Sequence, residues 1–212
     1  GYSEITKTEW TFAALYFIMG VSKLMWADID GAYGNIKIAY DLCKRGRDIY
    51  LKIFILMVYS IVLKERGDTG ELKKIIDEMD LNLKQNDVPP FLTSSYIGWK
   101  IYLFIENNQI EEANKIFSEY GLDPGTKITH SNEGAYSAYV RLLLAQNKLD
   151  EAELLLSELY ALAEDNNAIE KIIELKISFA VLFKLRGKQE KAIATLVEAM
   201  EFASEEHLLY YF

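Results

Sequence analysis

Three side chains in this 212-residue sequence have the chemistry of a nucleophile or a general base: Cys43, His130 and His207. Nucleophilic catalysis needs a thiol close to a base that a third group orients. The three residues are far apart in the sequence and share no motif. We therefore predict that Cys43 behaves as a small buried hydrophobic residue and that both histidines are ordinary surface residues. The chain is predicted to have no catalytic residues and not to be an enzyme.

Adjacent acidic residues are the next candidates, because paired carboxylates serve acid–base chemistry or hold metal ions. They occur as Glu111-Glu112, Asp150-Glu151 and Glu205-Glu206, beside expected helix ends, where the helix dipole accounts for them. A single cysteine gives zinc no thiolate cluster, and the sequence contains no Gly-x-x-x-x-Gly-Lys-Ser/Thr phosphate loop. We predict neither a metal nor a cofactor for these residues.

The elements that would position any site follow from an internal repeat. A small or polar turn residue, a short polar link and a small or apolar anchor recur five times, at intervals of 39 to 41 residues; the anchors are Ala32, Leu72, Ala113, Ala152 and Ala192. Residues at zero, four and seven positions lie on one face of an α-helix. The residues four and seven positions after the anchors are all apolar or aromatic and are predicted to be buried: Ile36, Ile76, Phe117, Leu156, Leu196, Ala39, Met79, Tyr120, Leu159 and Ala199.

A second apolar helix is predicted before each anchor helix, over residues 10–26, 49–65, 91–106, 133–146 and 169–186. Four turns between the paired helices hold residue types that accept the left-handed conformation ending a helix: Gly67, Asn108, Asn147 and Gly187. Three acidic residues stand where they favour the start of the next helix: Asp28, Asp68 and Asp150. Each repeat is therefore predicted to be a helical hairpin.

Hairpins of this kind bury their apolar faces only by stacking. The turn-rich segments between them show no strand pattern. Length alone allows one domain or two. With the repeat, we predict an all-α solenoid of about five helical hairpins with a period near 40 residues. It is expected to form one domain over residues 1–212, with units at roughly 6–47, 48–88, 89–127, 128–166 and 167–207.

Composition restricts the partners. The formal net charge of −9 repels a phosphate backbone, so we predict no direct contact with nucleic acid. The longest apolar run, residues 53–63, is much shorter than the roughly 20 residues that cross a bilayer, so no membrane contact is expected. A single cysteine is typical of a cytoplasmic protein. The start at Gly1 without a methionine, and the apolar end, lead us to expect a fragment of a larger protein.

The anchor pattern resembles the tetratricopeptide repeat (TPR), and Ala192, Leu196 and Ala199 are its best copy. Gly20 matches the small residue of the first helix in that repeat. Leu72 and Ile101 depart from its alanine and glycine, and the period exceeds the usual ~34 residues. The resemblance implies TPR-like hairpins wound into a right-handed superhelix.

Units of about forty residues with these signatures look like the helical-repeat domain of the MalT-type, ATP-dependent LuxR-family transcriptional regulators. The similarity is closest over residues 149–203 and in the aromatic-rich end, residues 206–212. It implies a parent protein with a nucleotide-binding switch before this domain and a DNA-binding helix-turn-helix after it. Neither motif is present in these 212 residues. The resemblance therefore implies a signal-sensing or coupling domain.

TPR geometry would line an inner groove with the residues 18, 15, 11, 8 and 7 positions before each anchor. In the first repeat these residues are wholly apolar, which is typical of a face covered by a preceding helix or another domain: Ala14, Phe17, Val21, Leu24 and Met25. In the middle repeats they include small residues that are expected to leave space beside Tyr102 and Arg141: Ser95, Gly98, Gly134 and Ser137.

The candidate ligand-binding residues are Tyr96, Trp99, Tyr102, Arg141, Lys64 and Lys184. Aromatic area with the directional hydrogen bonds of an arginine would suit a small polar ligand or a peptide terminus. The alternative is that Trp99 and Tyr102 pack between hairpins while Arg141 is solvated.

We therefore predict a sensing domain that binds a small-molecule or peptide effector, or other domains of a parent regulator. One alternative is a stand-alone TPR scaffold that binds peptides or a partner protein. Another is the repeat domain of a quorum-peptide receptor.

Overall fold

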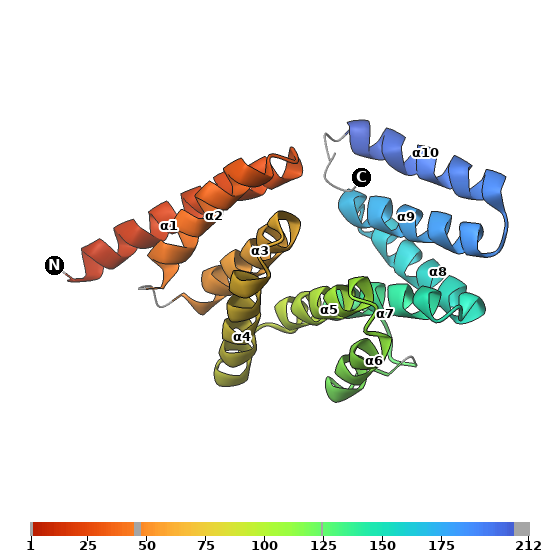
Figure 1. The fold of residues 1–212 in the computed structure, drawn as a ribbon, viewed down its shortest axis with the longest axis horizontal. Helices are drawn as coiled ribbons and strands as arrows, with labels where there is room; N and C mark the ends of the chain where they lie inside the picture. Colours follow the sequence, from red (N-terminus) through yellow and green to blue (C-terminus); the bar gives the residue numbers. More distant parts are fainter. Residues whose placement is uncertain (1, 45–47, 124, 206–212) are drawn as a thin grey trace. The chain divides into compact units, whose positions relative to one another are not determined.

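The computed structural model describes residues 2–44, 48–123 and 125–205 (Figure 1). These residues contain no strand and form ten α-helices: α1 (Tyr2–Met25), α2 (Ile29–Cys43), α3 (Ile49–Arg66), α4 (Thr69–Gln85), α5 (Pro90–Glu106), α6 (Ile110–Glu119), α7 (Glu133–Ala145), α8 (Leu149–Asp165), α9 (Ile169–Leu185) and α10 (Gln189–Glu205). The all-α fold of helical hairpins is confirmed. The first helices of the second to fifth hairpins lie within a residue of their predicted bounds, whereas α1 begins earlier, because no glycine or proline precedes Trp10 within it.

The turns follow the predicted chemistry. Gly67, Asn108, Asn147 and Gly187 all have positive φ, between 57° and 74°. The Asp28 side chain accepts a hydrogen bond from the Gly31 N–H at the start of α2, and Asp68 does the same for Glu71 in α4. Asp150 lies in the first turn of α8 without capping it. The left-handed turns and the acidic helix starts therefore define the hairpins.

The chain forms two compact units, residues 1–88 and 89–212. Unit 1 contains the hairpins α1–α2 and α3–α4, and unit 2 contains α5–α6, α7–α8 and α9–α10. The boundary coincides with the predicted boundary between the second and third repeats, directly before Pro89 and Pro90. A single domain over residues 1–212 and a right-handed superhelix remain predictions.

Most of the predicted apolar stripe lies in the cores of the two units: Ile36, Ala39, Met79, Phe117, Leu156, Leu159 and Ala199 are buried. Ile76 is half-buried. Tyr120 and Leu196 are each 38% exposed, so the prediction was wrong for them. Tyr120 lies just beyond the end of α6, and Leu196 lies on α10, which no later helix covers among the described residues.

The helices α5 and α7 meet at their backbones. A β-carbon on Gly98 would lie 2.5 Å from the carbonyl oxygen of Gly134. The hydroxyl of Ser94, on α5, accepts a 2.9 Å hydrogen bond from the Ala135 N–H in the first turn of α7. The small residues therefore bring two helices together and do not leave the space that we expected beside Tyr102 and Arg141.

Candidate functional site

An aromatic pair on α5 forms one side of the site. Trp99 and Tyr102 are one helical turn apart, and their rings stack with centroids 5.4 Å apart and an interplanar angle of 29°. Both residues are half-buried. The indole Nε1 of Trp99 is buried and has no hydrogen-bond partner among the described residues. The pair therefore offers aromatic surface, and its indole donor is buried without a partner among the described residues.

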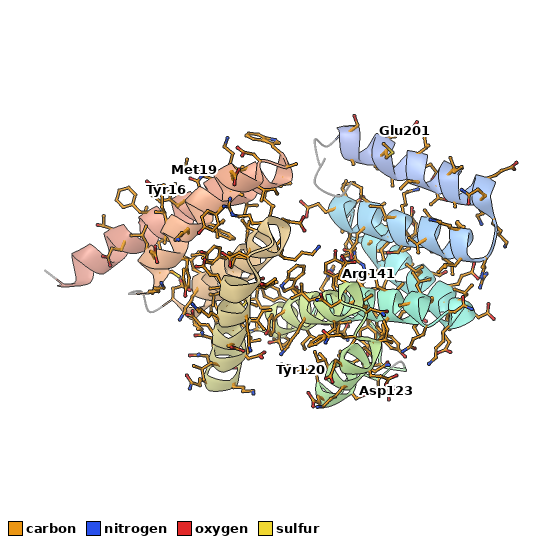
Figure 2. The ribbon with its side chains drawn as sticks, in the orientation of Figure 1. Tyr16, Met19, Tyr120, Asp123, Arg141 and Glu201 are labelled. Carbon is orange, nitrogen blue, oxygen red and sulfur yellow. The ribbon has the colours of Figure 1, made fainter. Side chains whose placement is uncertain are left out.

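Arg141, on α7 and labelled in Figure 2, contacts both this pair and the next hairpin. Its guanidinium carbon lies 5.1 Å from the centroid of the Tyr102 ring, in the geometry of a cation–π contact. Its Nη2 donates a 3.3 Å hydrogen bond to a carboxylate oxygen of Glu174, on α9. The side chain of Arg141 is 37% exposed, so a molecule in solution can still reach it.

Glu174 is held between two cations. Lys171, one turn earlier on α9, donates a 2.6 Å hydrogen bond to the other carboxylate oxygen and also lies 3.4 Å from the hydroxyl of Ser137, on α7. Burial opposes ionisation of Glu174, but the charges of Lys171 and Arg141 outweigh it and hold the pKa of Glu174 below its ordinary value. Glu174 is therefore an anion that orders both cations.

We call Trp99, Tyr102, Ser137, Arg141, Lys171 and Glu174 the Arg141 cluster. It draws on the first helices of three hairpins, α5, α7 and α9. Two cations face one carboxylate within it, so it carries a local positive excess in a chain of net charge −9. Aromatic faces and charge-assisted donors suit recognition of an anionic or hydroxyl-rich group.

The structure brings together three of the six predicted residues: Trp99, Tyr102 and Arg141. Tyr96 is completely buried. Lys184 is exposed near the end of α9, ten residues after Glu174, which corresponds to about 15 Å along the helix. Lys64 belongs to unit 1, where its Nζ lies 3.1 Å from the carboxylate of Glu65. Arg141 is paired with Glu174 while its side chain is still 37% exposed, so the alternative interpretation, in which Arg141 is solvated, stays a prediction.

Sequence reasoning missed Lys171 and Glu174 as members of the site. Glu174 stands 18 positions before its anchor and Arg141 stands 11 positions before its own, so both belonged to the expected groove. The missing step was to pair these positions across neighbouring hairpins. The opposite charges of the two residues were the available signal.

Within the described part of the chain, the other reactive side chains do not form a site. Cys43 is buried, its thiol lies 3.2 Å from the carbonyl oxygen of Tyr40, and burial raises its pKa to about 12. His130 is exposed and its pKa is raised, first by the Asn166 side chain and then by Glu133. His207 lies outside the described residues. Those residues contain no group of three or more His, Cys, Asp and Glu side chains that could hold a metal ion. None of their helices is both long and apolar enough to span a bilayer.

Stacked antiparallel hairpins, with left-handed turns and small residues at the helix contacts, define a TPR-like helical-repeat domain. More particularly, the chain belongs to the family of MalT-like TPR regions, whose family model matches residues 9–212. A similar solved structure is that of a putative kinesin light chain from Podosopora anserina, described as having nearly identical TPR-like repeats. The match has a TM-score of 0.55 and 11% identity, and it covers 91% of this chain and 95% of that one. This likeness shows the fold alone. No curated protein matches the chain.

Proposed function

We propose that this chain is the signal-sensing and coupling domain of a MalT-type, ATP-dependent LuxR-family regulator, and that its effector or partner binds the Arg141 cluster. The observation that carries the proposal is Arg141 itself, placed between the Tyr102 ring and the Glu174 carboxylate. The match of residues 9–212 to the model of MalT-like TPR regions supports it. Such a domain would work in the cytoplasm and leave DNA contact to another part of its parent protein.

The energetics favour binding at this cluster over a purely structural role. A buried N–H without a partner costs roughly 1–3 kcal/mol, and the Trp99 indole Nε1 has no partner among the described residues. Arg141 and Lys171 together have more donors than Glu174 and Ser137 use. An anionic or hydroxylated ligand would therefore satisfy groups that the free protein leaves only partly paired.

Binding there would also couple hairpins. The ligand would contact α5, α7 and α9 together, so it would favour the one arrangement of the three hairpins that presents all its partners. A ligand shifts a conformational equilibrium only through such a difference in affinity. This is the property that a sensing domain requires.

Isothermal titration calorimetry on the 212-residue chain tests the site, with short acidic peptides and neutral oligosaccharides as probes. A ligand that binds the cluster should lose roughly tenfold or more in affinity in Arg141→Ala, because a charge-assisted hydrogen bond contributes about 1.5–3 kcal/mol. Lys115→Ala is the matched control, because Lys115 is an exposed cation on α6. Equal loss in both variants would argue against the site.

A stand-alone scaffold for acidic peptides is the second candidate, and the positive excess of the Arg141 cluster favours it. The coding sequence around this domain separates the two. A phosphate loop upstream and a helix-turn-helix downstream would support the regulator. If both are missing and acidic peptides bind, the scaffold replaces it.

A further inference from the structure

Within each of the two units, neighbouring hairpins contact one another at fixed repeat positions. One contact joins an aromatic residue four or eight positions after an anchor to the residue 13 positions before the next anchor. It recurs as Tyr40 with Tyr59 at 5.3 Å, Phe117 with Tyr139 at 3.9 Å, and Tyr160 with Phe179 at 5.9 Å between ring centroids. The interface between two hairpins therefore has two halves. One half lies on the second helix of a hairpin, and the other lies on the first helix of the hairpin that follows.

A second contact of this interface is polar. It joins the residue one position after an anchor to the residue six positions before the next. Arg66 lies 4.2 Å from the Tyr33 ring centroid. The Gln146 amide donates to Asn114 at 3.0 Å, and Arg186 donates to Glu153 at 2.5 Å. These positions report which side of a helix faces the neighbouring hairpin.

The two terminal helices leave both halves of this interface exposed. On α10, the residues one, four and eight positions after the anchor are Ile193, Leu196 and Met200, which are 54%, 38% and 50% exposed. Met19, on α1, stands 13 positions before the anchor and is 53% exposed (Figure 2). Trp26, directly after the end of α1, stands six positions before the anchor and is 64% exposed. In the described structure, the second-helix half of the interface is thus uncovered on α10, and the first-helix half is uncovered on α1.

At both ends of the chain, the residues of this interface are also more hydrophobic than their equivalents in the other hairpins. Six positions before the anchor, the other four hairpins carry Arg66, Asn107, Gln146 and Arg186, and only the first carries a hydrophobic residue, Trp26. One position after the anchor, only the last hairpin carries an aliphatic residue, Ile193. The repeat positions that make a polar contact inside the chain are therefore occupied by hydrophobic residues at its two ends. If the first and last hairpins of two copies packed in the same way, Trp26 and Ile193 would face each other.

We propose that copies of this chain associate head to tail, with α10 of one copy packed on α1 of the next. Trp26 of one copy then lies against Ile193 of the other, and Met19 lies against Leu196 and Met200. The occupant of each face is a second copy, because this chain supplies both complementary halves of its own interface. A head-to-tail contact of this type leaves a free half at each end, so assembly continues beyond the dimer as concentration rises, into a closed ring or an open filament.

Analytical ultracentrifugation of the full chain at increasing concentration tests the proposal. The mean mass should rise through dimers to larger species. Met19→Glu blocks the α1 half and Met200→Glu blocks the α10 half, and each variant alone should remain monomeric. Both positions are half or more exposed, so the variants should keep their helical circular dichroism. Leu154→Glu, at an exposed α8 position outside the interface, should assemble like the unmodified chain.

Mixing the two blocked variants gives the decisive result. The intact α10 of Met19→Glu can bind the intact α1 of Met200→Glu, so the mixture should form a 1:1 dimer that does not grow. A mixture that stays monomeric overturns the proposal, as does a symmetric dimer that only one of the variants disrupts. An unmodified chain that is monomeric at every concentration also overturns it and assigns the faces to a different partner.

Discussion

At the scale of single residues, Ala27 adopts a conformation that its side chain disfavours. It joins α1 to α2 with φ 57°, in the left-handed region where the corresponding turns use Gly67, Asn108, Asn147 and Gly187. For a residue with a β-carbon, this conformation is less favourable by a free energy of roughly 1–2 kcal/mol. The sequence alignment placed Ala27 at this turn, but alanine gave no sign of the conformation.

Ala27→Gly should therefore stabilise the chain by about 1 kcal/mol, because relief of this strain exceeds the greater freedom of glycine in the unfolded chain. The shift in urea midpoint at unchanged m-value measures it. Ala161→Gly, at an exposed position inside α8, is the control and should destabilise by roughly 0.5–1 kcal/mol. Loss of stability in both variants would contradict the argument.

Glu174 gives the second prediction at this scale. Its pKa is lower in the folded chain than the ordinary value of about 4.3. Its ionisation therefore contributes its full stability above that value, and the contribution disappears as the pH falls through the folded-state pKa. Glu174→Gln should cost about 1–2 kcal/mol at pH 7, because it leaves Arg141 and Lys171 without their shared anion.

Urea unfolding of both proteins from neutral to acidic pH measures this dependence. The difference between Glu174→Gln and the unmodified chain should shrink as the pH falls below about 4. Glu158→Gln, an exposed carboxylate on α8, serves as the control and should show little difference at any pH. A cost for Glu174→Gln that does not change with pH would show that its charge is not the cause.

At the scale of elements, the contact between α5 and α7 depends on glycine. A β-carbon on Gly98 would lie 2.5 Å from a backbone oxygen that cannot move away without shifting α7. Gly98→Ala should therefore destabilise the chain by roughly 1–3 kcal/mol. Gly34 is an exposed helical glycine on α2 with no atom near its would-be β-carbon. Gly34→Ala should stabilise by about 0.5–1 kcal/mol.

Thermal unfolding followed by circular dichroism measures both changes, and their opposite signs provide the test. If both alanines stabilise, then helix propensity dominates at Gly98 and the close approach of the two backbones is unimportant. Equal destabilisation would show instead that glycine flexibility is needed at either place.

The helices themselves were largely predictable from the sequence, because four of the five hairpins end their first helix with a glycine or asparagine that signals the turn. Gly67 and Gly187 carry the left-handed turn, and Asp28 and Asp68 cap the helix that follows. Contacts between helices were less predictable. Ser95, Gly98 and Gly134 have the same composition whether they open a groove or close a helix contact, and only the register of α5 against α7 decides between the two.

At the scale of the whole molecule, the chain separates into two compact units. A continuous hydrophobic cluster of unit 2 extends from Ile97 to Ala192 and includes no residue of unit 1. Residues 89–212 expressed alone should therefore fold, with a helical spectrum and a cooperative melting transition. Residues 128–212, which lack α5 and α6, should melt at a lower temperature, because they lose the partner of α7. A fragment 89–212 without a cooperative transition would contradict the prediction.

The candidate site was predictable in part. Aromatic and arginine positions were visible in the repeat register, so Trp99, Tyr102 and Arg141 were found. Lys171 and Glu174 depend on which positions of adjacent hairpins face each other, and that follows from the spacing and rotation of successive hairpins. Tyr96 was misplaced because the position 17 residues before an anchor faces the core. A repeat pattern predicts which face of each helix is buried, but it does not predict which side chain of the neighbouring hairpin each residue contacts.

The hydrogen bond from the Ala135 N–H to Ser94 has a consequence for the order of folding. Asn132, which precedes α7, makes no capping hydrogen bond to that helix, so its first turn is completed by a side chain 41 positions earlier in the chain. The Ala135 N–H therefore gains this partner only after α5 has docked, and in a nascent or refolding chain without α5 the first turn of α7 would fray more readily. In this part of the molecule, completing the first turn of α7 is coupled to the docking of the preceding hairpin.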